Sequence, residues 1–304
     1  MEEDKDKAKT KEDRAEKALG EELTPSFRKK EPTKSGASSA GPTIPILIVL
    51  VGALLIFGVT KMLSSDKDHR DLVGEMKSKR FGNRWIAAFE LSKLVLGEGI
   101  DPSEIPWLVE NLIDVYDTTM DHRTRNFIVI TLGHLKHPLG LPLLEKALDD
   151  PDPTVVFSAV VAVGNLPEGM GIHWPKLMAL TTSSDEGIRH GACLALSAKR
   201  APGARPFIEA RLKDEAVSVR YGAALALIPY RSEKARSIIR DILERETHDR
   251  FDAVKFQQVR LGVISAIGRN RWIAFSGDLQ KLAKRTRDLR IETAAKEALN
   301  LLKM

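Results

Sequence analysis

The sequence predicts an all-α protein in which a solenoid of about seven helix pairs follows a charged tail and one apolar helix. Three observations support this prediction. A ten-residue pattern recurs, because Ser218–Leu227 reads SVRYGAALAL and Gly187–Leu196 reads GIRHGACLAL. The 304 residues include 43% hydrophobic, 29% charged and only 6% aromatic residues, a composition that favours a helical globular protein. An uncharged apolar run, residues 44–60, precedes the repeats.

Residues 1–43 are predicted to form a disordered tail. They carry ten Lys/Arg and ten Asp/Glu residues, and Pro, Ser and Gly become frequent toward the end of the segment. Such a segment cannot bury enough apolar surface to offset the conformational entropy that folding removes.

Residues 44–63, IPILIVLVGALLIFGVTKML, are predicted to form a transmembrane helix. About 20 helical residues span the hydrocarbon core of a bilayer, and the run reaches that length if Lys61 extends its ammonium group to the interface. A buried core helix is the alternative. Flanking basic residues are equal in number on the two sides, whereas the highly charged tail favours a cytoplasmic N-terminus. The expected localisation is therefore single-pass in a membrane, with the lipid bilayer as a partner through residues 44–63.

A short polar linker, residues 64–71, is expected next, and the repeats occupy residues 72–304. Seven segments align, and an arginine begins the second helix of most of them. The aligned positions are Arg84, Arg125, Val156, Arg189, Arg220, Arg260 and Arg290, with spacings of 41, 31, 33, 31, 40 and 30 residues. Asp-rich turns such as DDPDPT and SSDEG precede the second helices, where aspartate acts as a cap. Self-similarity at this period indicates a solenoid of stacked helix pairs.

The pattern L…LL…aL.D.d..VR..Aa.AL resembles the HEAT-repeat family, in the short form also found in phycobilisome lyase subunits. The resemblance covers about residues 72–304 and is strongest in the units of Arg189 and Arg220. It implies a HEAT-like α–α superhelix whose second helices line a concave face. It also implies protein–protein contacts rather than a particular reaction.

The sequence contains no catalytic or cofactor-binding motif that we recognise. The single cysteine, Cys193, excludes an intrachain disulfide and lies in an alanine-rich run that is typical of a buried thiol. His134 and His137 are three residues apart, but Pro138 ends the helix there and no carboxylate is near, so no metal site is predicted. We expect a non-catalytic scaffold without a cofactor that binds an unidentified protein. The alternative class is an enzyme or enzyme subunit of the chromophore-lyase type.

Nucleic-acid binding is the other alternative, because charge is unevenly distributed. Residues 199–304 carry 23 Lys/Arg against 13 Asp/Glu, within a net charge of +5 for the chain. A continuous basic stripe on the concave face would favour nucleic acid, whereas scattered charges would not. The predicted membrane anchor argues against this partner.

We define the arginine column as Arg84, Arg125, Arg189, Arg220, Arg260 and Arg290. Asp121 and Asp185 stand four residues before Arg125 and Arg189. The spacing predicts a structural ladder of ion pairs between each arginine and a turn aspartate of its own or the adjacent unit.

The concave face is the predicted partner site. The residue after each arginine, and the residue four positions further on, are mostly apolar. The candidate binding residues are Trp85, Phe157, His190, Tyr221, Leu225 and Leu261. Two interpretations remain open: these side chains are half-buried between neighbouring second helices, or they line an apolar groove that holds a hydrophobic segment of the partner. Solvent exposure distinguishes the two.

Overall fold

The computed structural model describes residues 67–78, 84–97, 99–249 and 251–303. Within these ranges the chain forms seven helix pairs, or units, and no strand. The first helices of the units are α3 (His69–Lys77), α5 (Ile105–Thr118), α7 (Leu141–Ala147), α9 (Trp174–Ala179), α11 (Arg205–Ala210), α13 (Arg236–Glu244) and α15 (Ser276–Arg285). The second helices are α4 (Arg84–Gly97), α6 (His122–Leu135), α8 (Pro153–Asn165), α10 (Glu186–Ala198), α12 (Val217–Ala226), α14 (Ala253–Arg269) and α16 (Leu289–Lys303).

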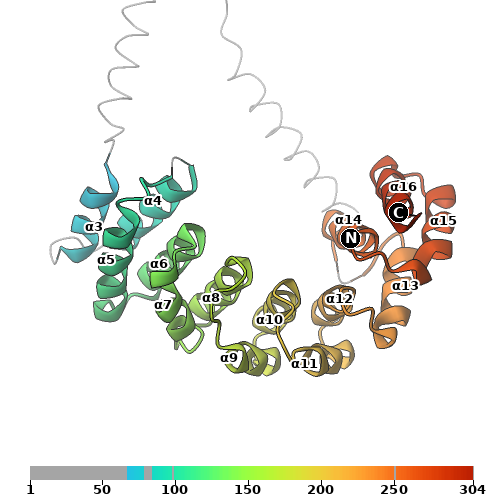
Figure 1. The fold of residues 1–304 in the computed structure, drawn as a ribbon, viewed down its shortest axis with the longest axis horizontal. Coiled ribbons are helices and arrows are strands. Elements are labelled where there is room, and N and C mark those ends of the chain that lie inside the picture. Colours follow the sequence, from blue (N-terminus) through green and yellow to red (C-terminus); the bar gives the residue numbers. More distant parts are fainter. Residues whose placement is uncertain (1–66, 79–83, 98, 250, 304) are drawn as a thin grey trace, which may run out of the picture. The chain divides into compact units, whose positions relative to one another are not determined.

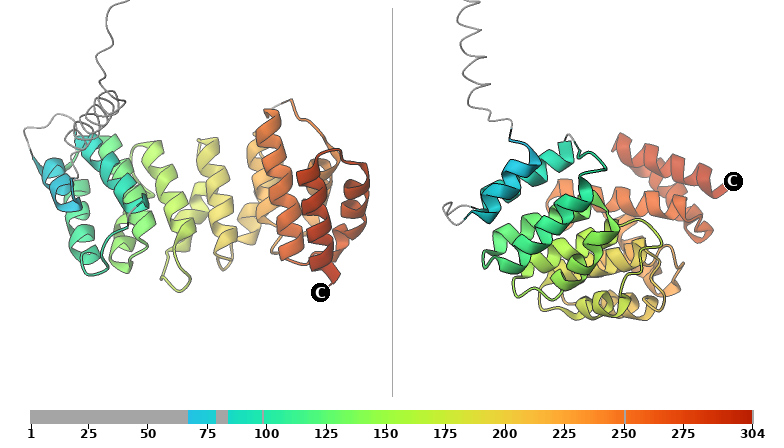
Figure 2. Two further views of the ribbon diagram at one scale, coloured as in Figure 1. Left: turned by 90° about the horizontal axis from the view of Figure 1, so that it is seen from above. Right: turned by 60° about the vertical axis from the view of Figure 1, so that its left-hand side comes forward.

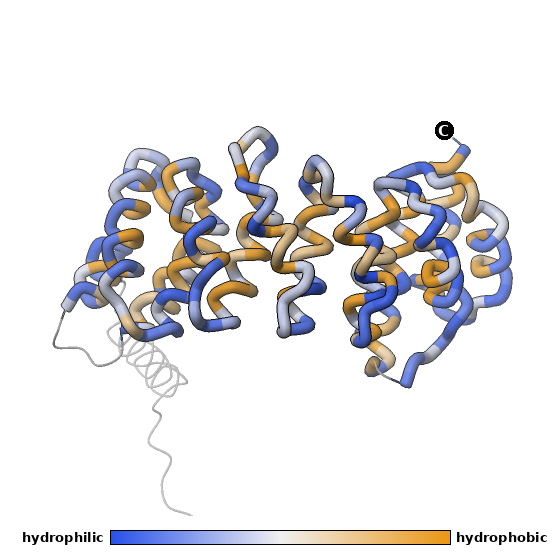
Figure 3. The backbone as a smooth tube through the Cα atoms, turned by 90° about the horizontal axis from the view of Figure 1, so that it is seen from below, coloured by the Kyte–Doolittle hydropathy of each residue, from blue (hydrophilic) through white to orange (hydrophobic). Residues whose placement is uncertain are grey.

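Residues 66–304 form one compact solenoid with two layers of helices. The first helices lie on the outer side of an arc, and the second helices α4 to α14 lie on its inner, concave side (Figure 1). Apolar residues concentrate where the helices pack, and polar residues mark the turns at both edges (Figure 3). Each unit therefore buries its apolar face only by stacking on its neighbours, which is the physical basis of a solenoid.

The predicted transmembrane helix requires a correction. Among the residues that the structure describes, no helix is both long enough and apolar enough to cross a bilayer. The longest of them, α14, has 17 residues and includes charged side chains such as Lys255 and Arg260, whereas a span needs about 20 predominantly apolar residues. The predicted span 44–63 and the predicted tail 1–43 lie outside the described residues. The fold class is therefore a HEAT-like solenoid without an established membrane span, and the predicted membrane localisation and bilayer contact are not retained.

The solenoid begins earlier than the sequence predicted. The helix α3 starts at His69, inside the predicted linker 64–71, and the side chain of Asp68 caps it by accepting a hydrogen bond from the Asp71 amide at 2.8 Å. A short capped helix of this kind shields the apolar face of the first unit from water.

Small residues let the second helices approach one another closely. A Cβ atom added to Gly133 in α6 would lie 2.7 Å from the Cβ atom of Ala162 in α8. The same approach recurs one unit later, where Gly164 faces Ala195 at 3.0 Å. Any larger side chain at these crossings would push the helices apart, so the glycines fix the spacing of the inner layer.

The stacking changes between α12 and α14. These two helices contact each other much less than the other neighbouring second helices do, and residues 245–252 separate α13 from α14 in the sequence. The rings of Phe251 and Tyr221 stack with centroids 5.8 Å apart, and Phe256 lies beside them. An aromatic cluster thus replaces direct helix packing at this joint.

Candidate functional site

An apolar cleft of about 430 Å³ opens between α8 and α10, on the concave side. Its lining residues are Phe157, Val161, Gly164, Asn165, Gly187, His190, Gly191, Leu194, Ala195 and Ala198. The side chain of Phe157 is 42% exposed, and Val161 is exposed to the same degree. No charged residue occurs anywhere in α8. A large aromatic ring is therefore open to solvent on an uncharged surface.

The ring of Phe157 packs beside two glycines of α10. A Cβ atom added to Gly191 would lie 3.6 Å from Phe157 Cε2, and one added to Gly187 would lie 3.8 Å from the same atom. The ring thus lies against bare backbone of the neighbouring helix, and the floor of the cleft stays shallow and apolar.

His190 forms one wall of the cleft and is a packing residue. A Cβ atom on Gly222 of α12 would lie only 2.7 Å from His190 Cδ2, so the imidazole fills the space that the glycine leaves. Burial lowers the pKa of His190 from its ordinary value of about 6.5. The ring is therefore neutral near pH 7, which suits an apolar surface.

The other candidate binding residues do not extend the cleft into a continuous groove. Tyr221 is only 5% exposed, and its hydroxyl donates a hydrogen bond of 2.7 Å to Asp241. Leu225 and Leu261 are half-buried and pack against the core. Trp85 is half-buried, and the guanidinium of Arg123 lies over its ring, 5.0 Å from the centroid. The cleft is therefore local to α8 and α10, and Tyr221 is not part of it.

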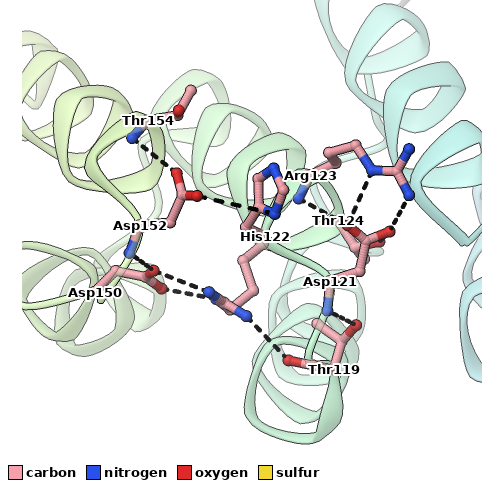
Figure 4. Close-up of polar contacts among 9 residues, drawn as sticks. Thr119, Asp121, His122, Arg123, Thr124, Asp150, Asp152 and Thr154 are labelled. Carbon is pink, nitrogen blue, oxygen red and sulfur yellow. Dashed lines mark hydrogen bonds and ion pairs between the residues drawn. The ribbon is translucent and has the colours of Figure 1, made fainter.

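The arginine column makes contacts between units. Arg125 donates to both carboxylate oxygens of Asp150 in the next turn, from Nε at 2.8 Å and from Nη2 at 3.0 Å. Its Nη1 atom donates to the Thr119 carbonyl at 3.3 Å, so the guanidinium bridges two turns (Figure 4). Burial raises the pKa of Asp150, but hydrogen bonds from Arg125 and Tyr116 outweigh that effect and hold the pKa below its usual value.

Arg189 repeats the arrangement two units later. It donates to both oxygens of Asp214, at 3.0 Å and 2.8 Å, and both side chains are buried. Its Nη1 atom donates to the carbonyls of Ser183 and Ser184, at 2.9 Å and 3.0 Å. The partner is thus the aspartate of the following turn, 25 residues after the arginine in both cases.

The turn aspartates that precede these arginines have a different role. Asp121 accepts a hydrogen bond from the backbone N–H of Arg123, and Asp185 accepts one from that of Ile188 (Figure 4 shows Asp121). Each therefore caps its own second helix, and the ion pairs form with the adjacent unit instead.

The remaining members of the column have no buried carboxylate partner among the residues that the structure describes. Arg220 donates only to the carbonyls of Asp214 and Glu215. Arg260 is 2% exposed, donates to the Leu243 carbonyl and to Gln257, and has no partner for Nε among the described residues. Burial lowers the pKa of Arg260.

The two ends of the column lie in less buried surroundings. Arg290 pairs with Asp288 of its own turn and is exposed. Arg84 forms no ion pair with any residue that the structure describes.

A regularity in the sequence explains which units pair. The paired carboxylate stands two residues before the cap of the next second helix, as Asp150 does before Asp152 and Asp214 before Ala216. Where Val156 replaces the arginine, the corresponding residue of the next turn is Ser183, two residues before Asp185. Thr286 holds this position for Arg260, which is retained, so the aspartate two residues before the next cap, rather than the arginine, indicates which units pair.

The described residues offer little for covalent or metal chemistry. No group of three metal-ligating side chains occurs among them. Cys193 is buried, and burial raises the pKa of its thiol to about 12. The uncharged surface of α8 also interrupts any basic stripe along the concave face.

The comparisons with known proteins agree with this geometry. Residues 175–255 match the HEAT repeats family. This span includes the units of Arg189 and Arg220, in which the HEAT pattern is clearest. No curated protein sequence matches the chain.

Two solved structures are similar to the whole solenoid of HEAT-like units. The X-ray structure of YibA from Escherichia coli has a TM-score of 0.55 at 17% sequence identity, covering 79% of this chain and 83% of that one. The complex of CpcE and CpcF of phycocyanin lyase from Nostoc has a TM-score of 0.52 at 16% identity, covering 78% of this chain and 95% of that one. At these identities the similarity establishes the fold alone.

Proposed function

We propose that this HEAT-like solenoid is a non-catalytic scaffold that binds a partner protein through its concave face. The observation that carries the proposal is the exposed ring of Phe157 in the uncharged cleft between α8 and α10. Exposed apolar surface that is concave and rigid is typical of protein-binding sites, because burying it against a partner removes it from water. An apolar side chain or helix of the partner fits the cleft.

The surrounding structure supports a rigid binding surface. The crossings at Gly133 and Gly164 fix the spacing of the second helices, and the pairs of Arg125 and Arg189 tie adjacent turns together. A surface held in this way loses little conformational entropy when a partner binds.

The test compares two phenylalanines of equal exposure. Phe157 on α8 is 42% exposed and Phe207 on the outer helix α11 is 43% exposed. The full-length wild type, F157E and F207E are used as bait for affinity purification, with quantitative mass spectrometry. We expect one protein in stoichiometric amount with the wild type and F207E, and its loss with F157E.

A photo-crosslinking amino acid at Val161 then identifies the contact. A crosslink from position 161 to the same protein, and none from position 207, supports the cleft. Retention of the partner by F157E, with its thermal stability unchanged, would assign the binding site to another surface.

A further inference from the structure

Four basic residues adopt an unusual backbone conformation at one repeated position. The non-glycine residues with positive φ are Lys136, Arg200, Arg231 and Arg271, with φ between 46° and 51°. Each stands 11 residues after the corresponding arginine of the column, in the turn that leads from a second helix to the next unit. We call these four residues the basic edge.

Backbone preference does not account for lysine or arginine here. The left-handed conformation after a helix favours glycine, because a side chain there costs about 1 kcal/mol or more. The helix dipole attracts basic residues, but a lysine in the last regular turn would serve it equally well. The property that the four residues share is their charge, so the charge is the feature that needs explanation.

The basic edge is exposed, and its charges are not neutralised. All four side chains are exposed. Lys136, Arg200 and Arg271 make no side-chain hydrogen bond or ion pair with the described residues. Arg231 donates to the Asn270 carbonyl at 2.9 Å, a neutral acceptor in the next unit.

These turns lie along a single side of the solenoid. In the view onto the second helices, it is the side on which the C-terminus is marked (Figure 2, left). The row is interrupted in the third unit, where a longer turn carries Glu168. Glu209 lies near the row, but its carboxylate already forms ion pairs with Lys234 and Arg205. Hydrogen bonds from these two side chains lower the pKa of Glu209 to about 2.

We propose that the basic edge binds an acidic segment of a protein in extended conformation. This site is separate from the cleft at Phe157 and does not depend on it. Neighbouring second helices pack about 8–10 Å apart, and three extended residues span about 10 Å. An acidic residue at every third position therefore meets Arg200 and Arg231, which follow adjacent second helices, and about six extended residues bridge Lys136 and Arg200, between which the third unit lacks a basic residue.

The density of charge beside the basic edge favours a protein segment over nucleic acid. Asn165 and Ala198, which end α8 and α10, are uncharged, whereas Arg269 ends α14 and Lys199 follows α10 with its ammonium donating to the Leu166 carbonyl. The cations are therefore spaced more widely along this edge than the phosphates of a nucleic acid, and uncharged residues of a peptide can lie between them.

The experiment uses a fluorescein-labelled peptide of six Asp-Gly-Ser repeats and measures fluorescence anisotropy with the full-length protein at 50 mM salt. The edge variant is K136G/R200G/R231G/R271G, in which glycine suits the left-handed backbone. The control variant is K213Q/K281Q/K284Q/R287Q. It also removes four positive charges, but at exposed positions away from the basic edge. We expect the edge variant to bind at least about tenfold more weakly, since four surface pairs are lost, and the control variant to bind like the wild type.

Three outcomes would overturn the proposal. The first is equal weakening in the edge and control variants, which would mean that net charge alone attracts the peptide. The second is no measurable binding by the wild type. The third is tighter binding, dependent on the basic edge, of a single-stranded oligonucleotide of equal charge. The F157E variant should bind the peptide like the wild type, so this test and the test of the cleft can fail independently.

Discussion

Replacing Arg189 by valine and Asp214 by serine transfers the Val156/Ser183 combination into the fourth unit. The wild-type guanidinium makes two hydrogen bonds to Asp214 and two to the carbonyls of the preceding turn. The Asp214 side chain is 3% exposed. The two positions therefore form a buried unit whose energy a double-mutant cycle can measure.

Each single variant should lose more unfolding free energy than the double variant loses. R189V leaves a buried carboxylate without its main partner, which costs about 3–5 kcal/mol of unfolding free energy. Arg211, 3.5 Å from Asp214, compensates in part and favours the lower end of that range. D214S leaves a buried guanidinium with carbonyl acceptors and with the exposed carboxylate of Glu215, 3.6 Å from Nη2, and should cost about 2–3 kcal/mol. The double variant removes both charges, so we expect a loss of about 1–2 kcal/mol and a coupling energy of about 3 kcal/mol.

Urea denaturation of the full-length protein, followed by circular dichroism at pH 7, provides the four free energies. Additive losses, with a coupling energy below about 0.5 kcal/mol, would refute the idea that the two residues act as a pair.

Acid provides a second check on the same pair. Burial raises the pKa of Asp214, but the hydrogen bonds from Arg189 and Ala216 outweigh it and lower the pKa in the folded state. The pair thus contributes fully above about pH 4, the ordinary pKa of aspartate, and the contribution is lost as the pH falls through the lowered value. The wild type and D214S should therefore become equally stable in acid.

Three further predictions concern the arginine column and the inner layer, and urea denaturation checks each. Thr286 stands two residues before the turn aspartate Asp288, the sequence position that Asp150 and Asp214 hold for Arg125 and Arg189, so T286D should supply a carboxylate to Arg260 and raise the unfolding free energy by about 1–3 kcal/mol; a loss of stability would show that the geometry does not transfer. G133A should destabilise by about 1–3 kcal/mol because of the 2.7 Å contact with Ala162, whereas G74A, which has open space in α3, should stabilise slightly. R220A removes only two carbonyl contacts and should cost about 1 kcal/mol, clearly less than R189V.

The repeat allowed the helix pairs to be predicted from sequence, because each unit places its apolar residues at helical spacing around a recurring arginine. The spacing left open whether an arginine pairs with a turn aspartate of its own or of the adjacent unit. Asp121 and Asp185 are near Arg125 and Arg189 in sequence, but their carboxylates accept hydrogen bonds from backbone N–H groups. The partners come from the adjacent unit, where an aspartate stands two residues before the next cap.

The concave face was predictable in its position but not in its extent. Helical angles place Tyr221 and Phe157 on the same side of their helices, yet one is buried and the other exposed. The difference arises where Phe251, shortly before α14, stacks on the ring of Tyr221. The spacing of 40 residues in this unit indicated an insertion, but spacing does not reveal which side chain an insertion covers.

The pairing of Arg125 and Arg189 with an aspartate of the next turn also constrains how such a chain can gain or lose units during evolution. If the unit of α9 and α10 were deleted at its turns, α8 with Val156 would precede the turn that contains Asp214. A buried aspartate would then face a valine. A deletion with both breakpoints inside second helices, near the arginine position, would keep each arginine with its own aspartate. The segment that recombination can exchange without loss of stability therefore runs from the middle of one second helix to the middle of the next, and not from turn to turn.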